Sequence, residues 1–152
     1  GQTVGAARDW TLTLVGDGPE REALQRQVQL AGLQEQVQFL GFRSDPQTFL
    51  LQAGVFVLPS RFEGMPNALL EAMAAGLGVV GTDASPGPLE VVVNGVSGLV
   101  VPSDDPFALA DALDRLAADP LLRERLGAAA RDTLRQSDWP VVGPIWESLV
   151  DH

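Results

Sequence analysis

Short β-prone segments alternate with helical patterns along most of this chain, and this alternation limits the possible folds more than any other feature. The β-prone segments are WTLTLV (10–15), VQFL (37–40), VFVL (55–58), the pair Val79 and Val80, and GLVV (98–101). Strands that alternate with helices through short connections predict an α/β fold, a Rossmann-like parallel sheet with helices on both faces. VFVL has no polar residue, which favours a strand buried on both of its faces.

Glycine and proline mark where the helices between these strands begin and end. Helical patterns cover about 20–31, 66–75, 105–118 and 119–135, a short helix begins at 44–47, and a last piece covers about 141–149. Proline suits the first helical position, where Pro46 and Pro66 stand. Glycine suits the residue after a helix, where Gly32 and Gly76 stand.

The length of 152 residues fits one domain. We expect an irregular lead-in over 1–9, a β/α core over 10–104 and C-terminal helices over 105–152. A complete doubly wound unit usually has another strand and helix before the first strand found here. We therefore expect this chain to lack the first strand–helix unit of its domain.

The charge and composition exclude several classes of protein. The net charge is −10 and no residue is a lysine, so the basic stripe of a nucleic-acid-binding protein and the lysine of a P-loop are both absent. No cysteine is present, which excludes disulfides and cysteine-based zinc sites and fits a cytoplasmic location. No apolar run reaches the roughly 18 residues that a transmembrane helix needs.

The segment RFEGMPNALLEAMAAG (61–76) sets two glutamates around a helix start. Gly64 allows the backbone to approach a ligand closely, and the N–H groups of Asn67, Ala68 and Leu69 form the positive end of the helix dipole. Glu63 before the helix and Glu71 inside it flank these donors, and carboxylates accept hydrogen bonds from sugar hydroxyls. This order fits a ligand with phosphates between two sugars, as in a nucleotide sugar.

A purely structural explanation accounts for the same residues about equally well. Glu63 could stabilise the helix dipole and nothing more. Glu71 lies among apolar residues, where a salt bridge to Arg43 or Arg61 would stabilise its charge. Taken by itself, the motif is compatible with ligand binding and with a purely structural role of the two glutamates.

The same segment resembles the signature of the large retaining glycosyltransferase family 4, the "group 1" enzymes of GT-B fold. The shared features are two glutamates separated by seven residues and the Ala-Met-Ala-x-Gly that follows. LTLVGDGPERE, VQFLGF, VFVLPSRFEG and NGVSGLVVPSDDPFALADAL are similar to further segments of these enzymes, in the same order. The resemblance therefore covers nearly the whole chain and matches the C-terminal, donor-binding domain.

The resemblance implies a role for each matching residue. Glu71 would bind the ribose hydroxyls, and Glu63 the hydroxyls of the transferred hexose-type sugar. The backbone from Gly64 through Met65 and Asn67 to Ala68, Leu69 and Leu70 would hold the diphosphate and part of the sugar. The main chain of Phe42 and Arg43 would contact the base, and Gly16 and Gly18 would form a turn near the cleft.

The resemblance also implies what this chain does not supply. No side chain is an evident catalytic nucleophile or base, and no metal or other cofactor is expected. The partners would be a nucleotide-sugar donor and an N-terminal acceptor-binding domain, with peripheral membrane association possible for the parent protein. An isolated donor-binding half would be inactive. A nucleotide-sugar epimerase-like enzyme and a non-catalytic nucleotide-binding regulatory module are the alternatives.

Overall fold

A computed structural model describes residues 10–61, 64, 67–84 and 86–136 of the chain. Its contacts divide the chain into two compact units, Gly1–Pro46 and Gln47–His152, which are treated separately below. The expected helical piece at 141–149 lies outside the described residues.

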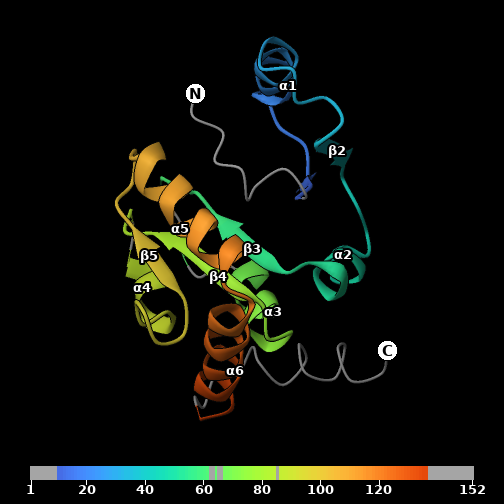
Figure 1. The fold of residues 1–152 in the computed structure, drawn as a ribbon. Helices are drawn as coiled ribbons and strands as arrows, with labels where there is room; N and C mark the ends of the chain where they lie inside the picture. Colours follow the sequence, from blue (N-terminus) through green and yellow to red (C-terminus); the bar gives the residue numbers. More distant parts are fainter. Residues whose placement is uncertain (1–9, 62–63, 65–66, 85, 137–152) are drawn as a thin grey trace. The chain divides into compact units, whose positions relative to one another are not determined.

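The strands are β1 (Leu12–Val15), β2 (Val37–Gly41), β3 (Val55–Leu58), β4 (Gly78–Thr82) and β5 (Leu99–Val101) (Figure 1). The helices are α1 (Arg21–Leu30), α2 (Pro46–Gln52), α3 (Asn67–Ala74), α4 (Pro86–Val91), α5 (Pro106–Ala118) and α6 (Pro120–Gln136).

The first unit contains a parallel pair of strands joined by a helix. β1 pairs with β2 in the register Leu12 to Val37 and Leu14 to Phe39. α1 connects the two strands and ends before Gly32, which has a φ of +69°. This is the left-handed backbone that glycine adopts at the end of a helix, so the expected helix stop is confirmed.

The second unit contains a three-stranded parallel sheet in the order β3-β4-β5. The prediction of an α/β fold with parallel strands is therefore confirmed, with the strands divided between a two-stranded and a three-stranded sheet. The prediction that VFVL is buried on both faces is wrong, because all four residues of β3 are only half-buried. β4 is the strand that is buried along its whole length, since it lies between β3 and β5.

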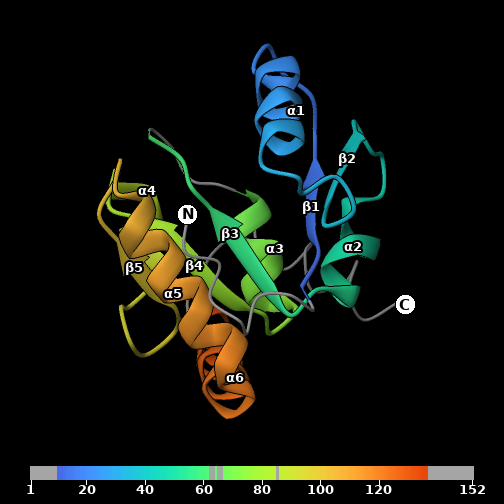
Figure 2. The same ribbon diagram turned by 45° about the horizontal axis from the view of Figure 1, so that its top comes forward.

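Helices cover both faces of β4 (Figure 2). Val79 packs into one apolar cluster with residues of α3, α4 and α6, among them Met73, Val91 and Leu134. Val80, the next residue, packs into a second cluster that contains Leu116 of α5. Successive side chains of a strand point to opposite faces, so β4 supplies the centre of both clusters.

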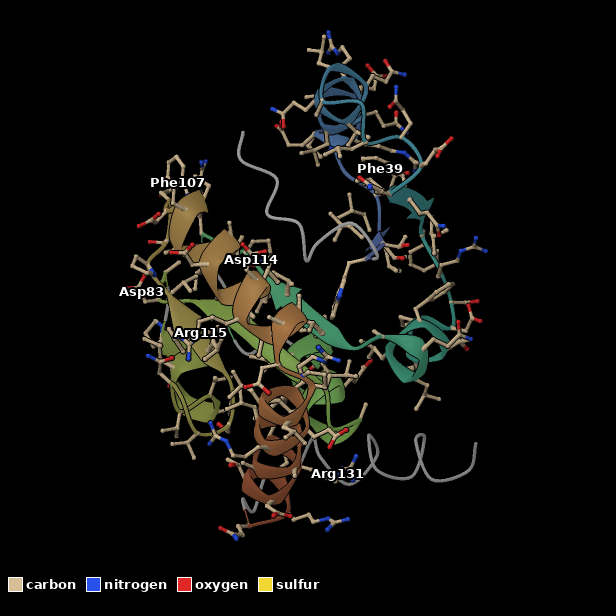
Figure 3. The ribbon with its side chains drawn as sticks, viewed as in Figure 1. Phe39, Asp83, Phe107, Asp114, Arg115 and Arg131 are labelled. Carbon is tan, nitrogen blue, oxygen red and sulfur yellow. The ribbon has the colours of Figure 1, made fainter. Side chains whose placement is uncertain are left out.

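Tight backbone contacts fix the carboxyl end of α3. The Gly76 N–H donates to Met73 O at 3.0 Å and the Leu77 N–H donates to Ala72 O at 3.1 Å, the pair of bonds of a Schellman motif. Arg131 of α6 adds a bond from its guanidinium to Ala75 O at 3.1 Å (Figure 3). The end of the helix that carries the glutamate motif is thus held by α6.

Aspartates begin the last two described helices, as the sequence predicts. Asp105 Oδ1 accepts hydrogen bonds from the N–H groups of Phe107 at 3.1 Å and Ala108 at 2.9 Å. Asp119 Oδ1 accepts from the Leu122 N–H at 3.0 Å. In both cases the side chain satisfies donors of the first helical turn that have no partner inside the helix.

Candidate functional site

The glutamate motif lies where β3 ends and α3 begins, at the carboxyl edge of the three-stranded sheet. β3 ends at Leu58, the described residues 59–61 and 64 follow it as a loop, and α3 starts at Asn67. Ligands of open α/β sheets bind at this edge. Gly64 is described and exposed, whereas Glu63 and Met65 lie outside the described residues, so their predicted roles in sugar binding stay predictions.

The first turn of α3 combines exposed backbone with buried anchors. Asn67 and Ala68 are exposed, whereas the side chains of Leu69 and Leu70 are fully buried in the core. The first N–H groups of a helix have no acceptor within it, and they carry the positive end of the helix dipole. The buried leucines hold this turn in place, and a helix start of this kind can bind an anion.

Glu71 is half-buried between Leu70 and Ala72, which are both fully buried. Burial raises the pKa of the Glu71 carboxyl above the ordinary glutamate value, because removal of water disfavours the charged form. Within the part of the chain that the structure describes, no ion pair includes Glu71. The salt bridge to Arg61 that the sequence left open is not formed, since Arg61 bonds Asp104 instead.

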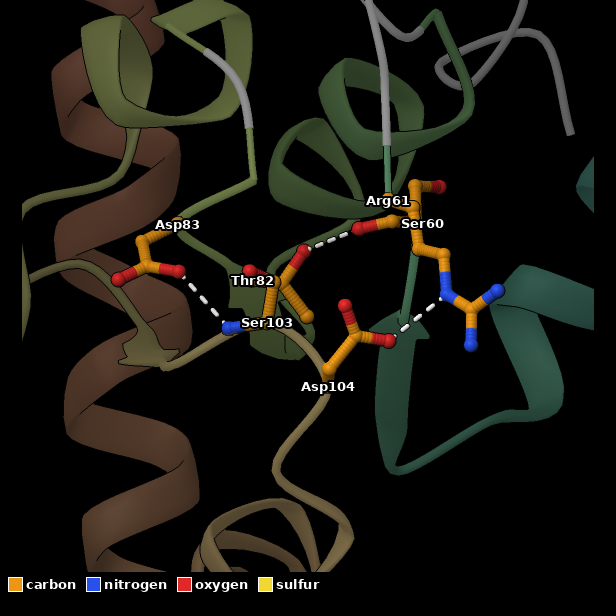
Figure 4. A network of polar contacts seen from close by, with 6 residues as sticks. All are labelled: Ser60, Arg61, Thr82, Asp83, Ser103 and Asp104. Carbon is orange, nitrogen blue, oxygen red and sulfur yellow. Dashed lines mark hydrogen bonds and ion pairs between the residues drawn. The ribbon is translucent and has the colours of Figure 1, made fainter.

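A polar network joins the ends of β3, β4 and β5 beside the loop (Figure 4). The Thr82 hydroxyl at the end of β4 donates to the backbone carbonyl of Ser60. Arg61 Nε donates to Asp104 Oδ1 at 2.7 Å, and the Ser103 N–H donates to Asp83 Oδ1 at 2.8 Å. Two of these bonds connect Ser60 and Arg61, which follow β3, to residues at the ends of β4 and β5, and the third joins the segments that follow β4 and β5.

The role of Thr82, Asp83 and Asp104 in this network was not predicted from the sequence. Each stands at or shortly after the carboxyl end of a predicted strand, and that position is the signal that could have marked them. Their partners are 20 to 43 residues away in the chain, so no local pattern connects them.

The other predicted site residues lie together at the carboxyl ends of β1 and β2 in the first unit. Gly16 has a φ of +121°, and its N–H donates to Gly41 O at 2.8 Å. The exposed Gly18 donates its N–H to Asp17 Oδ1 at 2.9 Å. Phe42, 83% exposed, and the exposed Arg43 follow β2 directly. The structure therefore brings Gly16 and Gly18 to the same sheet edge as the two residues expected to contact a base.

An open depression of about 200 Å³ lies at the amino end of β4, on the opposite edge of the sheet from the glutamate motif. Arg123, which lines it, donates hydrogen bonds to the carbonyl oxygens of Leu116 and Ala117 at the end of α5. The Arg123 guanidinium therefore caps the end of α5, which gives this arginine a structural role. We do not take the depression as the candidate site.

Two further observations concern metals and membranes. Over residues 10–61, 64, 67–84 and 86–136, no three histidine, cysteine, aspartate or glutamate side chains gather as a metal site would require. In the same part of the chain, no helix has the length and apolar character that crossing a bilayer demands.

These features define an α/β domain with an exposed helix start and a half-buried carboxylate at one sheet edge. Residues 4–133 match the family described as "Glycosyl transferases group 1". The chain belongs to this family.

The chain is similar to parts of longer bacterial proteins. The chain is 40% identical over 124 residues to the lipopolysaccharide core biosynthesis glycosyltransferase LpsD of Rhizobium meliloti, which covers 82% of this chain and 36% of LpsD. It is 36% identical over 141 residues to an exopolysaccharide phosphotransferase of Streptomyces coelicolor, covering 92% of this chain and 15% of the relative. The chain thus spans little more than a third of LpsD and much less of the other relative.

Solved structures share the fold. The C-terminal domain of LpcC, a group 1 family glycosyl transferase from Francisella tularensis, has a TM-score of 0.78 and 30% identity, covering 85% of this chain and 70% of that one. HepE from Anabaena in complex with UDP has a TM-score of 0.79 and 26% identity, covering 93% of this chain and 40% of HepE. The expected GT-B C-terminal domain fold is confirmed.

Proposed function

We propose that this chain is the donor-binding half of a retaining glycosyltransferase that transfers a hexose-type sugar from a nucleotide sugar. The observation that carries the proposal is the pairing of an exposed helix start with a half-buried Glu71 that has no ion-pair partner among the described residues. A carboxylate held in this way keeps its acceptor oxygens available to a ligand. The UDP bound to HepE supports a nucleoside diphosphate as the ligand class.

Each predicted residue then has a place along the donor. The backbone from Gly64 to Leu70 binds the diphosphate and part of the sugar, with donors at the positive end of α3. Glu71 accepts hydrogen bonds from the ribose hydroxyls, and Glu63 accepts them from the transferred sugar. The resemblance further implies that the main chain of Phe42 and Arg43 contacts the base and that Gly16 and Gly18 form a turn near it.

The chemical contribution of this half is electrostatic. Cleavage of the donor places negative charge on the departing diphosphate, and fixed N–H donors aimed at that charge lower the barrier. We nominate no side chain of this chain as nucleophile or base, and no metal. In this proposal the acceptor binds to an N-terminal domain, so we expect this half to be inactive by itself.

Membership in the group 1 family favours this function over an epimerase-like enzyme. An epimerase needs acid and base side chains in its cleft, and the only histidine of this chain is its last residue. A non-catalytic regulatory module would bind the same ligand and differs only in the lack of transfer. We propose the cytoplasm as the compartment, since a chain without cysteine fits reducing conditions.

Titration of UDP into the labelled chain, followed by amide chemical shifts, tests the proposal. We expect shifts at Gly64 and over residues 67–71, and we expect Glu71→Ala to abolish them while circular dichroism stays unchanged. Glu124→Ala is the matched control, because Glu124 is exposed on α6 at the opposite sheet edge. Equal binding by the Glu71→Ala variant would refute the assigned role.

A further inference from the structure

We propose that Thr82 is a positioning residue that holds Ser60, at the start of the loop between β3 and α3, in the arrangement that favours donor binding, with Asp104 as a second and weaker tether on Arg61. This inference rests on the proposed function, because it concerns how the same site is held in shape. Neither residue belongs to the glutamate motif, and neither is expected to touch the ligand.

The place of Thr82 makes it suited to this task. It is the last residue of β4, the fully buried central strand, and it is only 8% exposed. Its hydroxyl donates to the carbonyl of Ser60, 22 residues earlier and two residues after the end of β3. A rigid strand thus holds the loop at its beginning.

Comparison with the other buried polar residue supports a specific role. Thr82 and Ser97 are the buried polar side chains of the described residues. The Ser97 hydroxyl accepts from the Val93 N–H, four residues away, and so stabilises only its own turn. Thr82 connects two distant segments, and one of them leads directly into the glutamate motif.

Asp104 forms the second tether in a less protected place. It bonds Arg61, the next residue of the loop, but the two side chains are 63% and 84% exposed. Exposed ion pairs contribute little, since water and salt screen them. Asp104 is the non-glycine residue with positive φ, +59°, in the described part of the chain, and the Asp83 bond to the Ser103 N–H holds the adjacent backbone.

The two tethers act on the consecutive residues Ser60 and Arg61, shortly after the end of β3. Residues that are already held in place lose less conformational entropy when a ligand arrives. The tethers should therefore strengthen donor binding without any contact to the donor.

Three variants of the chain test this role. Thr82→Val removes the hydroxyl and keeps the shape of the side chain. Thr82→Ser keeps the hydroxyl and removes the methyl group. Thr133→Val is the matched control, because the Thr133 hydroxyl donates to Ala129 O at 2.8 Å inside α6. Amide hydrogen exchange at Ser60, Arg61 and Gly64 is measured without ligand, and the Kd for UDP and the Tm are measured for each variant.

We expect Thr82→Val to speed exchange in the loop and to raise the Kd for UDP about three- to tenfold, the effect of one lost hydrogen bond. In Thr82→Ser, loop exchange and the Kd for UDP should be like those of the parent chain. Thr133→Val should change neither quantity, whatever its Tm. Unchanged loop exchange in Thr82→Val, or equal effects of Thr82→Val and Thr133→Val, would overturn the proposal. If UDP fails to bind the unsubstituted chain, the proposed function fails, and loop exchange still decides whether Thr82 holds the loop.

Discussion

Gly127 of α6 packs directly against the backbone of Gly76, the residue that ends α3. A Cβ atom at position 127 would lie 2.0 Å from the carbonyl oxygen of Gly76. Both residues belong to the contact that holds α3, and α3 carries the glutamate motif. The absence of a side chain at Gly127 is therefore a condition for the close approach of the two helices.

Gly127→Ala should destabilise the chain although alanine is the better helix former. The substitution gains about 1 kcal/mol in helix propensity. It also forces a methyl group into a backbone atom that cannot rotate away, and overpacking of a buried contact costs roughly 1–3 kcal/mol or more. We expect the clash to dominate and lower the free energy of unfolding, measured by urea denaturation. Gly18→Ala is the control, because a Cβ there meets nothing within 4 Å. A Gly127→Ala variant as stable as the parent would contradict this packing.

Glu71→Gln should stabilise the folded chain at neutral pH. Burial raises the pKa of Glu71 in the folded state, so between the ordinary glutamate pKa and the raised one the folded state binds more protons than the unfolded state. The contribution of Glu71 to the free energy of unfolding is therefore largest below this window and is lost as pH rises through it. The glutamine variant has no such dependence. Denaturation curves of both proteins at several pH values should converge at acid pH and separate toward neutral pH.

The same carboxyl should make donor binding depend on pH in the opposite sense. The charged form accepts stronger hydrogen bonds from ribose hydroxyls than the protonated form. Affinity for UDP-glucose should therefore fall as pH decreases through the raised pKa of Glu71. UDP-glucose is the suitable ligand because both of its phosphates are esterified, whereas the terminal phosphate of UDP titrates near pH 6. Glu71→Gln should bind more weakly and without this pH dependence, as calorimetry can measure. A parallel pH profile in the variant would assign the titration to another group.

Local signals in the sequence were sufficient for most of the fold. The glycine after α1 and the glycine after α3 both have the positive φ expected of a helix stop, and Asp105 and Asp119 both cap the helices they precede. These features depend on a few neighbouring residues, so a pattern in the chain can reveal them.

Long-range relations were not accessible in this way. The composition of VFVL could not show that β3 would be half-buried beside a fully buried β4, because strand order sets burial. The position of Glu71 could be predicted, but the choice of Asp104 as the partner of Arg61 could not, since 43 residues separate the two. The bond from Thr82 to Ser60 escaped prediction for the same reason.

Donor binding by this chain should not require a metal ion. We expect this because the proposed diphosphate site consists of backbone N–H groups at a helix start, which supply positive charge without a cation. The Kd for UDP-glucose should be the same with EDTA and after dialysis against metal-free buffer. A loss of binding in EDTA that manganese or magnesium restores would show that a cation takes part.

Asn67→Pro tests whether the backbone of α3 binds the diphosphate. Proline has no N–H, and its fixed φ suits the first turn of a helix, so this substitution removes a donor while the helix can still form. Asn67→Ala is the matched control, because it removes the exposed side chain and keeps the N–H. With UDP as ligand, we expect Asn67→Pro to weaken binding about tenfold or more, since a hydrogen bond to a charged group contributes about 1.5–3 kcal/mol. Asn67→Ala should bind UDP like the parent chain. Amide shifts of Leu70 and Glu71 report whether α3 is intact, and equal affinities of the two variants in an intact helix would exclude this N–H from the site.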